Sequence, residues 1–190
     1  MRAVLMLFNS RYKKMLRLLH IIALGLILSC LSGGAHANVW RQEMPKAKLI
    51  GSGELRWFGL RIYSAKLWSE TLRFDPKASF ALELTYQRNI TRERFVDTSI
   101  DEIKRLRGDT LSPEILQRWR LHMEKAFTDV NSGDQLIGVF IPQVGTRFYS
   151  SDKLLAEIRD GDFSDAFFAI WFDPRSKDSD LRKNLMGIPP

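Results

Sequence analysis

The amino-acid sequence predicts an α+β fold. Residues 80–86 alternate large apolar side chains with alanine, glutamate and threonine, a period of two that is typical of a half-buried strand. Residues 95–127 instead repeat apolar side chains at three- and four-residue spacing, which is typical of amphipathic helices. Strand-like segments precede and follow these helices, and this grouping indicates the α+β class.

Two hairpins are expected beside the strand at residues 80–86. The first lies within residues 51–68, GSGELRWFGLRIYSAKLW, with Phe58-Gly59 as its two-residue turn. The second pairs residues 135–141 with residues 146–150 around a turn that contains proline and glycine. Together these segments predict five strands.

Capping residues mark the ends of the first two helices. Thr91 is the expected N-cap of a helix whose apolar face runs over residues 95–106, and Gly108 stands where that helix should end. Ser112 caps the second helix, and Pro113 occupies its first turn, where a missing N–H costs nothing.

The C-terminal part predicts a third helix over residues 163–172, with Asp162 as its N-cap. Because this helix is apolar on most of its circumference, we expect it to be buried on more than one side. The helix breaks at Asp173-Pro174, and a short polar helix is expected near residues 179–186.

The first 37 residues are predicted to be a Sec signal peptide that is cleaved, which leaves residues 38–190 as a single domain. A basic segment at residues 11–17 precedes an apolar run at residues 21–28, and Ala35-His36-Ala37 is a typical cleavage site. The run is short for a membrane span of ~20 residues, so no stable span is expected after cleavage. The predicted location is the periplasm.

Two alternatives to this N-terminus stay open. Met15 begins a complete signal by itself and could be the true first residue. Ile27-Leu28-Ser29-Cys30 distantly resembles a lipoprotein box, in which Cys30 would carry a lipid anchor. Leucine fits poorly at the position before the small residue, so a soluble periplasmic protein is favoured over an anchored one.

Charge argues against nucleic acid as a partner. The chain has 29 basic and 22 acidic residues, but five basic residues and no acidic residue lie in the first 37. The remaining 24 basic and 22 acidic residues give a net charge of +2 and are mixed along the chain. A nucleic-acid surface needs a strong local excess of positive charge.

The residue types that most cofactors and metals need are scarce. Cys30 lies in the signal, and His122 is the one histidine after it. No histidine or cysteine pair has metal-ligand spacing, and neither a nucleophile-elbow motif nor a phosphate-binding glycine loop occurs. The sequence therefore predicts no metal and no cofactor, and any site must use arginine, tyrosine, threonine and apolar surface.

The first hairpin offers such a site. If Phe58-Gly59 is the turn, four pairs face each other across the strands: Trp57 with Leu60, Arg56 with Arg61, Leu55 with Ile62, and Glu54 with Tyr63. The apolar residues of these pairs would face the core, and the polar ones would share the other face. That second face is either solvated or part of a cleft in which arginine and tyrosine hold a carboxylate or enolate oxygen.

Four ordered segments of the chain resemble one known family. They are GSGELRWFGLRIYSAKLW, ALELTYQRNITRERF, AFTDVNSGDQLIGVFIPQVGTRFY and FSDAFFAIWFDPRSKDSDLRKNL, and they are similar to exported bacterial chalcone isomerase-like proteins. The resemblance implies an open antiparallel sheet with helices packed on one face and a ligand cleft between the layers. Plant enzymes of this fold close a chalcone into a flavanone without a cofactor, and non-catalytic members bind fatty acids.

The resemblance also implies site residues. Arg56 matches the arginine of the first hairpin, and Tyr63 matches the tyrosine that helps hold the carboxylate in fatty-acid-binding members. Tyr86 is the nearest substitute for the tyrosine of the catalytic members. Phe58 and Ile170 stand near positions where the enzymes carry threonine, and these departures count against chalcone isomerase activity.

Three hypotheses of function follow. The first is a binding protein for a small amphipathic or aromatic ligand, such as a fatty acid or similar carboxylate, held by Arg56, Tyr63 and Arg61, with the phenylalanine-rich helix at residues 163–172 along its tail. The second is a cofactor-independent isomerase of the intramolecular lyase type, acting on a conjugated carbonyl compound with Arg56, Tyr63 and Tyr86 as catalytic groups. The third is a structural or interaction domain without a small ligand. Binding ranks first, because a catalytic site needs matched groups.

Overall fold

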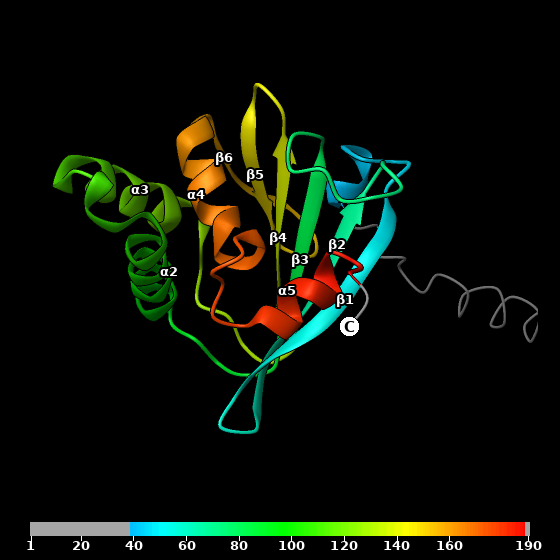
Figure 1. Ribbon diagram of the computed structural model, residues 1–190, viewed down its shortest axis with the longest axis horizontal. Helices are drawn as coiled ribbons and strands as arrows, with labels where there is room; N and C mark the ends of the chain where they lie inside the picture. The colour runs from blue at the N-terminus through cyan, green and yellow to red at the C-terminus, as the bar shows by residue number, and fades with distance from the viewer. Residues whose placement is uncertain (1–38, 189–190) are drawn as a thin grey trace, which may run out of the picture. The chain divides into compact units, whose positions relative to one another are not determined.

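An antiparallel sheet of six strands dominates residues 39–188, the part of the chain that the computed structural model describes (Figure 1). The strands lie side by side in the order in which the chain makes them. They are β1 (Lys48–Trp57), β2 (Leu60–Ser69), β3 (Phe80–Tyr86), β4 (Gln135–Ile141), β5 (Gly145–Tyr149) and β6 (Leu154–Ile158). The sheet is open, with β1 and β6 at its edges. The predicted signal peptide lies outside the described residues.

The α-helices of the described part pack on one face of this sheet (Figure 1). They are α2 (Arg92–Arg107), α3 (Pro113–Ala126), α4 (Gly161–Phe172) and α5 (Ser179–Leu185), with the short 3₁₀ helices η1 (Val39–Gln42) and η2 (Gly108–Thr110). Helix α4 contacts α2 and β5, α3 contacts α2 and β6, and α5 lies against β1 and β2. None of the helices between residues 39 and 188 is long and apolar enough to cross a bilayer.

The predicted caps of the first two helices are confirmed. The Thr91 hydroxyl accepts a hydrogen bond from Arg94 N at 3.3 Å, and α2 ends at Gly108, whose φ is +63°. Ser112 accepts from Ile115 N at 3.4 Å at the start of α3. These caps depend on residues within one turn of helix, which is why the sequence indicates them directly.

The predicted cap of α4 is wrong by two residues. Asp160, and not Asp162, is the N-cap, because its carboxylate accepts a hydrogen bond from Phe163 N at 2.9 Å. The same carboxylate lies 3.3 Å from Arg118 Nε and 3.3 Å from His122 Nε2. Asp160 therefore ties α3 to the beginning of α4, a tertiary role that the local sequence does not reveal. Strand β6 and helix η1 were also not predicted.

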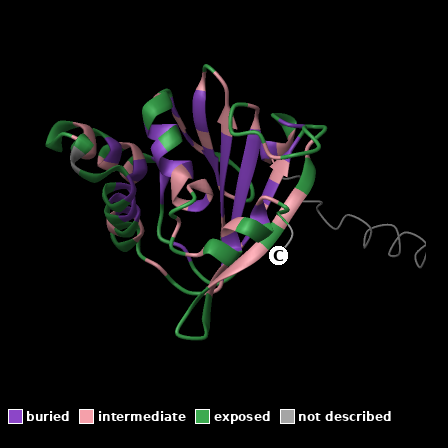
Figure 2. Ribbon diagram, viewed as in Figure 1, coloured by how far each residue is buried: buried purple, intermediate pink, exposed green. Residues whose placement is uncertain are grey.

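Aromatic side chains fill the layer between the sheet and the helices, and the ribbon of the sheet and of α4 is largely buried there (Figure 2). As expected, α4 is buried on more than one side, since Phe163 and Phe167 point into the main core with Phe168 and Trp171. A smaller cluster covers the opposite face of the sheet. There Trp40 and Met44, from η1 and the residues after it, pack on Ile137, Val139 and Tyr149.

The first hairpin turns at Phe58-Gly59 as predicted, but its pairing changes after two residues. Trp57 pairs with Leu60 and Arg56 with Arg61, whereas Leu55 pairs with Tyr63. Ile62 is an extra residue, a β-bulge that shifts the register by one. The predicted pairs of Leu55 with Ile62 and of Glu54 with Tyr63 are therefore wrong, and Glu54 faces Ser64.

The end of this hairpin extends beyond the rest of the sheet. Strand β3 pairs with β2 only from Tyr63 onward, since its last residue, Tyr86, stands opposite Tyr63. Trp57 and Leu60 consequently have no third strand beside them, and they are 60% and 50% exposed. The prediction that both belong to the core is wrong, because alternation assigns a residue to a face but does not show whether anything covers that face.

Candidate functional site

Two tyrosines meet where β2 and β3 pass under the helices. Tyr63 of β2 and Tyr86 of β3 are direct partners across the strands, with ring centroids 6.0 Å apart in an edge contact. The Tyr63 hydroxyl accepts a hydrogen bond from Trp171 Nε1 of α4 at 2.9 Å. Cross-strand partners share one sheet face, so the contact with α4 places both rings on the helix-covered face.

The hydroxyl of Tyr86 is buried without a hydrogen-bond partner among residues 39–188. The residue is 1% exposed, and its ring contacts the ring of Phe95 from α2 at 5.5 Å. A buried polar group without a partner costs about 1–3 kcal/mol, so native structures rarely keep one without a reason. A ligand oxygen that entered this layer would find a donor ready for it.

Burial also fixes the protonation state of the pair. Removal from water raises the pKa of both hydroxyls well above the usual value near 10, and the negative charges of Asp178 and Glu102 add to this effect at Tyr63. Both phenols are therefore neutral at physiological pH. Because the Tyr63 oxygen accepts from Trp171, its own proton stays available, and the two tyrosines can act as neutral hydrogen-bond donors.

A continuous set of aromatic rings surrounds the tyrosines. Phe95 stacks on Phe127 with centroids 4.4 Å apart. Phe127 contacts Phe167 at 5.9 Å, and Phe167 contacts Trp171 at 5.3 Å. These rings come from α2, the end of α3 and α4, and they give the tyrosine pair apolar surroundings suited to a hydrocarbon or aromatic group.

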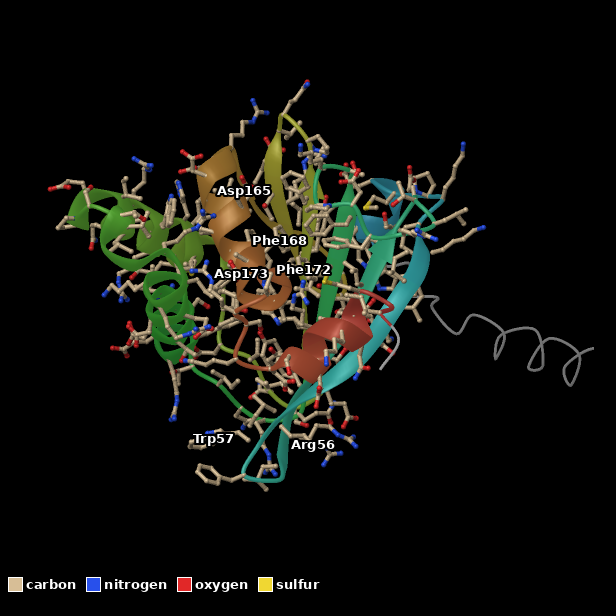
Figure 3. All side chains as sticks on the ribbon, viewed as in Figure 1. Arg56, Trp57, Asp165, Phe168, Phe172 and Asp173 are labelled. Carbon is tan, nitrogen blue, oxygen red and sulfur yellow. The ribbon has the colours of Figure 1, made fainter. Side chains whose placement is uncertain are left out.

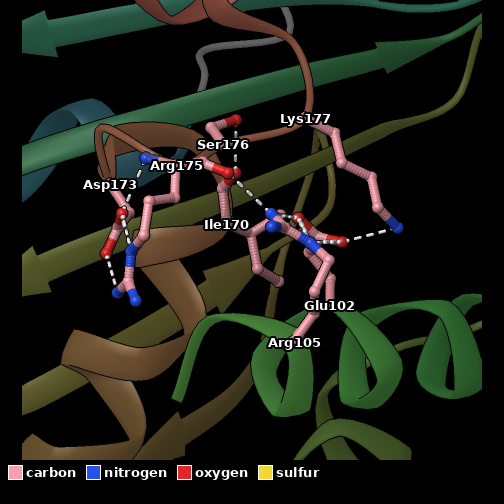
Figure 4. Close-up of polar contacts among 7 residues, drawn as sticks. All are labelled: Glu102, Arg105, Ile170, Asp173, Arg175, Ser176 and Lys177. Atoms are coloured by element: carbon pink, nitrogen blue, oxygen red, sulfur yellow. Dashed lines mark hydrogen bonds and ion pairs between the residues drawn. The ribbon is translucent and has the colours of Figure 1, made fainter. Parts of the chain in front are cut away.

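A polar cluster closes the edge of this layer between α2 and the chain that follows α4 (Figure 4). The Glu102 carboxylate contacts Lys177 Nζ at 2.7 Å and Arg105 Nη2 at 2.5 Å. Arg105 also donates to the carbonyl oxygen of Arg175 at 2.7 Å. Partial burial raises the pKa of Glu102, but the bonds from Arg105 and Lys177 outweigh it and hold that pKa below its usual value.

The structure does not bring Arg56 and Arg61 to the tyrosines. Glu54 contacts both arginines, at 2.8 Å from Arg56 Nη2 and 3.0 Å from Arg61 Nε. Since Leu55 shares a face with Tyr63, alternation puts these three charged residues on the other face. Figure 3 shows Arg56 at the projecting end of the hairpin. The expected single face with Arg56, Arg61 and Tyr63 is wrong, because the bulge at Ile62 turns Tyr63 to the opposite side.

Comparison with known proteins decides the family. A family model described as chalcone isomerase-like matches residues 43–187. The chain belongs to the chalcone isomerase-like family. Among solved structures, this chalcone isomerase-like chain is similar to the crystal structure of the Arabidopsis thaliana fatty-acid binding protein AtFAP1. That likeness has a TM-score of 0.57 and 11% sequence identity, and it covers 74% of this chain and 87% of that one.

The solved structure supports the fold alone at this identity, and that fold is the expected open antiparallel sheet with helices on one face. No curated protein sequence matches the chain. The chalcone isomerase-like assignment therefore rests on the family model and the architecture together.

The sequence did not identify two neighbours of the tyrosines in this candidate site. Trp171 and Phe95 were predicted to be buried helix residues, not neighbours of Tyr63 and Tyr86. A partial signal existed for Trp171, since a buried indole N–H usually has a hydrogen-bond partner. Its partner is 108 positions away in the sequence, so spacing could not have identified it.

His122 has a structural place in the fold. Its ring packs on Phe163 with centroids 5.4 Å apart and faces Asp160, at the opposite end of α4 from Trp171. Among the described residues, no cluster of three or more His, Cys, Asp or Glu could hold a metal ion.

Proposed function

We propose that this protein binds a small amphipathic carboxylate, such as a fatty acid, between its sheet and its helices. The observation that carries the proposal is the buried Tyr86 hydroxyl, which has no partner among the described residues and lies beside Tyr63. The name of the similar solved structure, a fatty-acid binding protein, supports the same class of ligand.

The tyrosine pair would hold the polar end of the ligand. Carboxylate oxygens accept hydrogen bonds from neutral phenols, and such bonds to a charged group are worth about 1.5–3 kcal/mol each. The rings of Phe95, Phe127 and Phe167 would contact the apolar part. In this proposal Tyr63 keeps its expected role, Tyr86 joins it, and Arg56 and Arg61 lie outside the site.

Removal of one hydroxyl tests the proposal. Tyr86→Phe should weaken binding of oleate by about tenfold or more, because one hydrogen bond to the carboxylate is lost. The same variant should be about 1 kcal/mol more stable without ligand, since the unpaired hydroxyl no longer costs free energy. Calorimetric titration with oleate and urea unfolding measure the two effects.

A matched control lies on the other sheet face. The Tyr149 hydroxyl donates to Glu43 at 2.9 Å, on the face of the sheet opposite the α-helices. Tyr149→Phe should leave the oleate affinity unchanged while it lowers stability. The proposal fails if wild-type protein does not bind oleate, or if Tyr86→Phe and Tyr149→Phe affect the affinity equally. Absence of any bound fatty acid would favour a structural or interaction domain.

A cofactor-independent isomerase is the second candidate. Two neutral phenols at one point could donate to an enolate oxygen, the kind of stabilisation that acyl and enolate chemistry uses. This candidate requires turnover of a chalcone or simple enone into one stereoisomer above the spontaneous rate. Racemic product at the background rate would leave binding as the function.

We also propose that the protein acts after export, as a soluble periplasmic protein. The support is the order of basic segment, apolar run and Ala35-His36-Ala37 in the sequence. A periplasmic protein that holds a fatty acid would keep a poorly soluble molecule out of water. Anchoring through Cys30 is the alternative.

A further inference from the structure

The end of the β1–β2 hairpin exposes three large apolar side chains. Phe58 is 87% exposed, Trp57 is 60% exposed and Leu60 is 50% exposed. The rings of Trp57 and Phe58 are in edge contact, with centroids 4.9 Å apart. In Figure 3, Arg56 and Trp57 lie at the end of the hairpin, away from the labelled residues of α4. We call residues 56–61 the hairpin tip.

Folding gives no reason for a phenylalanine at position 58. The φ angles of Phe58 and Gly59 are +47° and +77°, and turns with two positive φ values strongly favour asparagine, aspartate or glycine at the first position. A bulky side chain is strained there. Because the ring is also exposed, no burial of apolar surface offsets this cost. The phenylalanine is therefore explained better by a contact outside the fold.

The charge of the hairpin tip indicates the chemistry of that contact. Arg56 and Arg61 share the single carboxylate of Glu54, so these three residues carry a net positive charge. Both arginine side chains are about half exposed, at 53% for Arg56 and 46% for Arg61. Guanidinium groups bind phosphate well. Apolar side chains at the point and cations behind them match the order of a lipid surface, where phosphates lie outside the hydrocarbon.

We propose that the hairpin tip docks this protein on the surface of a lipid bilayer that contains anionic lipids. Trp57, Phe58 and Leu60 enter the interfacial region, where tryptophan in particular is favoured. Arg56 and Arg61 contact the lipid phosphates. Binding of this kind gains from buried apolar area and from attraction to anionic lipids together. The inference does not depend on the tyrosine pair, although a membrane is also where a fatty acid is found.

A second copy of the chain is a poorer occupant of the hairpin tip. Stable protein interfaces bury about 800 Å² on each partner, supplied by roughly 20–30 residues. The tip instead presents three apolar side chains on a single turn that projects from the sheet. A bilayer sets no such minimum area, because lipids surround each inserted side chain individually.

Co-sedimentation with vesicles tests the inference. Protein purified after expression of the full sequence, with any signal cleavage already complete, is mixed with two kinds of vesicle. One consists of phosphatidylcholine alone, and the other contains phosphatidylglycerol as well. We expect binding to the anionic vesicles that weakens at high salt. Phe58→Asn should lower the partition coefficient about tenfold or more, since it removes an aromatic side chain from the bilayer. It should not lower stability, because asparagine suits the turn.

Two variants serve as controls. Leu72→Asn removes a side chain that is 92% exposed but lies beyond the opposite end of β2, and it should leave vesicle binding unchanged. Tyr86→Phe should also bind vesicles normally, which separates this inference from the proposed ligand site. The inference is overturned if wild-type protein ignores anionic vesicles or if Phe58→Asn binds them equally. The inference is also overturned if the wild-type protein is a dimer in solution and Phe58→Asn is a monomer.

Discussion

Tyr86 and Phe58 have side chains whose chemistry the fold itself does not use. The hydroxyl of Tyr86 is buried beside Tyr63 without a partner among the described residues, and the ring of Phe58 is exposed on a turn that favours asparagine or glycine. Each costs free energy in the isolated chain. The two costs have opposite origins, a polar group without water and an apolar group in water, and the two proposals above assign a different molecule to relieve each.

Asp173, the residue that ends α4, allows a prediction about pH. Hydrogen bonds from the Arg175 side chain, at 2.9 Å and 2.8 Å, lower the pKa of Asp173 to about 2. A lowered pKa in the folded state means that the charged carboxylate stabilises the fold above the unfolded value of 3.8, and that this contribution is lost as the pH falls toward 2. Asp173→Asn should therefore be less stable than wild type at pH 7.

The difference between the two proteins should shrink between pH 4 and pH 2, where wild-type Asp173 itself becomes protonated. Urea unfolding across this range measures it. Other carboxylates titrate in both proteins, so the comparison isolates Asp173. An equal difference at pH 7 and pH 2 would show that the charge of Asp173 does not contribute.

The sequence was most informative where a few neighbouring residues determine the local structure. Thr91, Ser112 and the turn at Phe58-Gly59 lie where they were predicted, since caps and tight turns depend on neighbouring residues. Asp160 was missed, because its role also depends on Arg118 and His122 of another helix. The tyrosine site was predicted only in part, because the partners of Tyr63 come from distant segments.

Among the elements, α5 shows how closely one helix can approach a strand. A Cβ atom at Gly51 of β1 would lie 2.0 Å from the carbonyl oxygen of Asn184 and 2.6 Å from that of Leu185. The backbone of α5 therefore rests directly on β1, and only glycine permits this contact. The sequence placed Gly51 in the first hairpin without indicating that a C-terminal helix would lie on it.

Gly51→Ala should lower the free energy of unfolding by about 3 kcal/mol, because α5 must shift away from β1. Gly161→Ala is the matched control, since nothing lies within 4 Å of a Cβ atom at the start of α4. That variant should stay within about 1 kcal/mol of wild type. Urea unfolding compares the two, and equal effects would mean that the contact of α5 with β1 is not rigid.

The strand register shows why a strand can be predicted correctly while its side chains are assigned to the wrong face of the sheet. Alternation identified β1 and β2, but nothing local to residues 54–63 marked Ile62 as a bulge. The bulge lies just before Tyr63, where β3 ends beside β2, so its position depends on a strand that comes later in the chain. One extra residue was enough to reverse the predicted face of Tyr63.

For the whole molecule, the family and the architecture were predicted well, because four segments spread over most of the domain carry the resemblance. The structure adds that buried residues begin close to the predicted cleavage site. Trp40 is fully buried against the sheet, although it is only three residues beyond Ala37. Cleavage after Ala37 would therefore leave very little chain outside the fold.

The proposed export predicts a defined N-terminus. The mass of the protein purified from the periplasm should correspond to residues 38–190 without added lipid. Osmotic shock should also release the protein from the cells in soluble form. A mass that includes an acylated Cys30, or retention of the signal, would contradict this prediction. An anchored form would have only eight residues between its lipid and Val39.

The bulge at Ile62 also separates the two proposed sites along the first hairpin. Under the two proposals, substitutions at residues 56–61 should change what the hairpin tip contacts outside the fold, and substitutions from Tyr63 onward should change what the aromatic layer accepts. We therefore expect that exchanging residues 56–61 between relatives transfers the outer specificity and leaves the inner one intact.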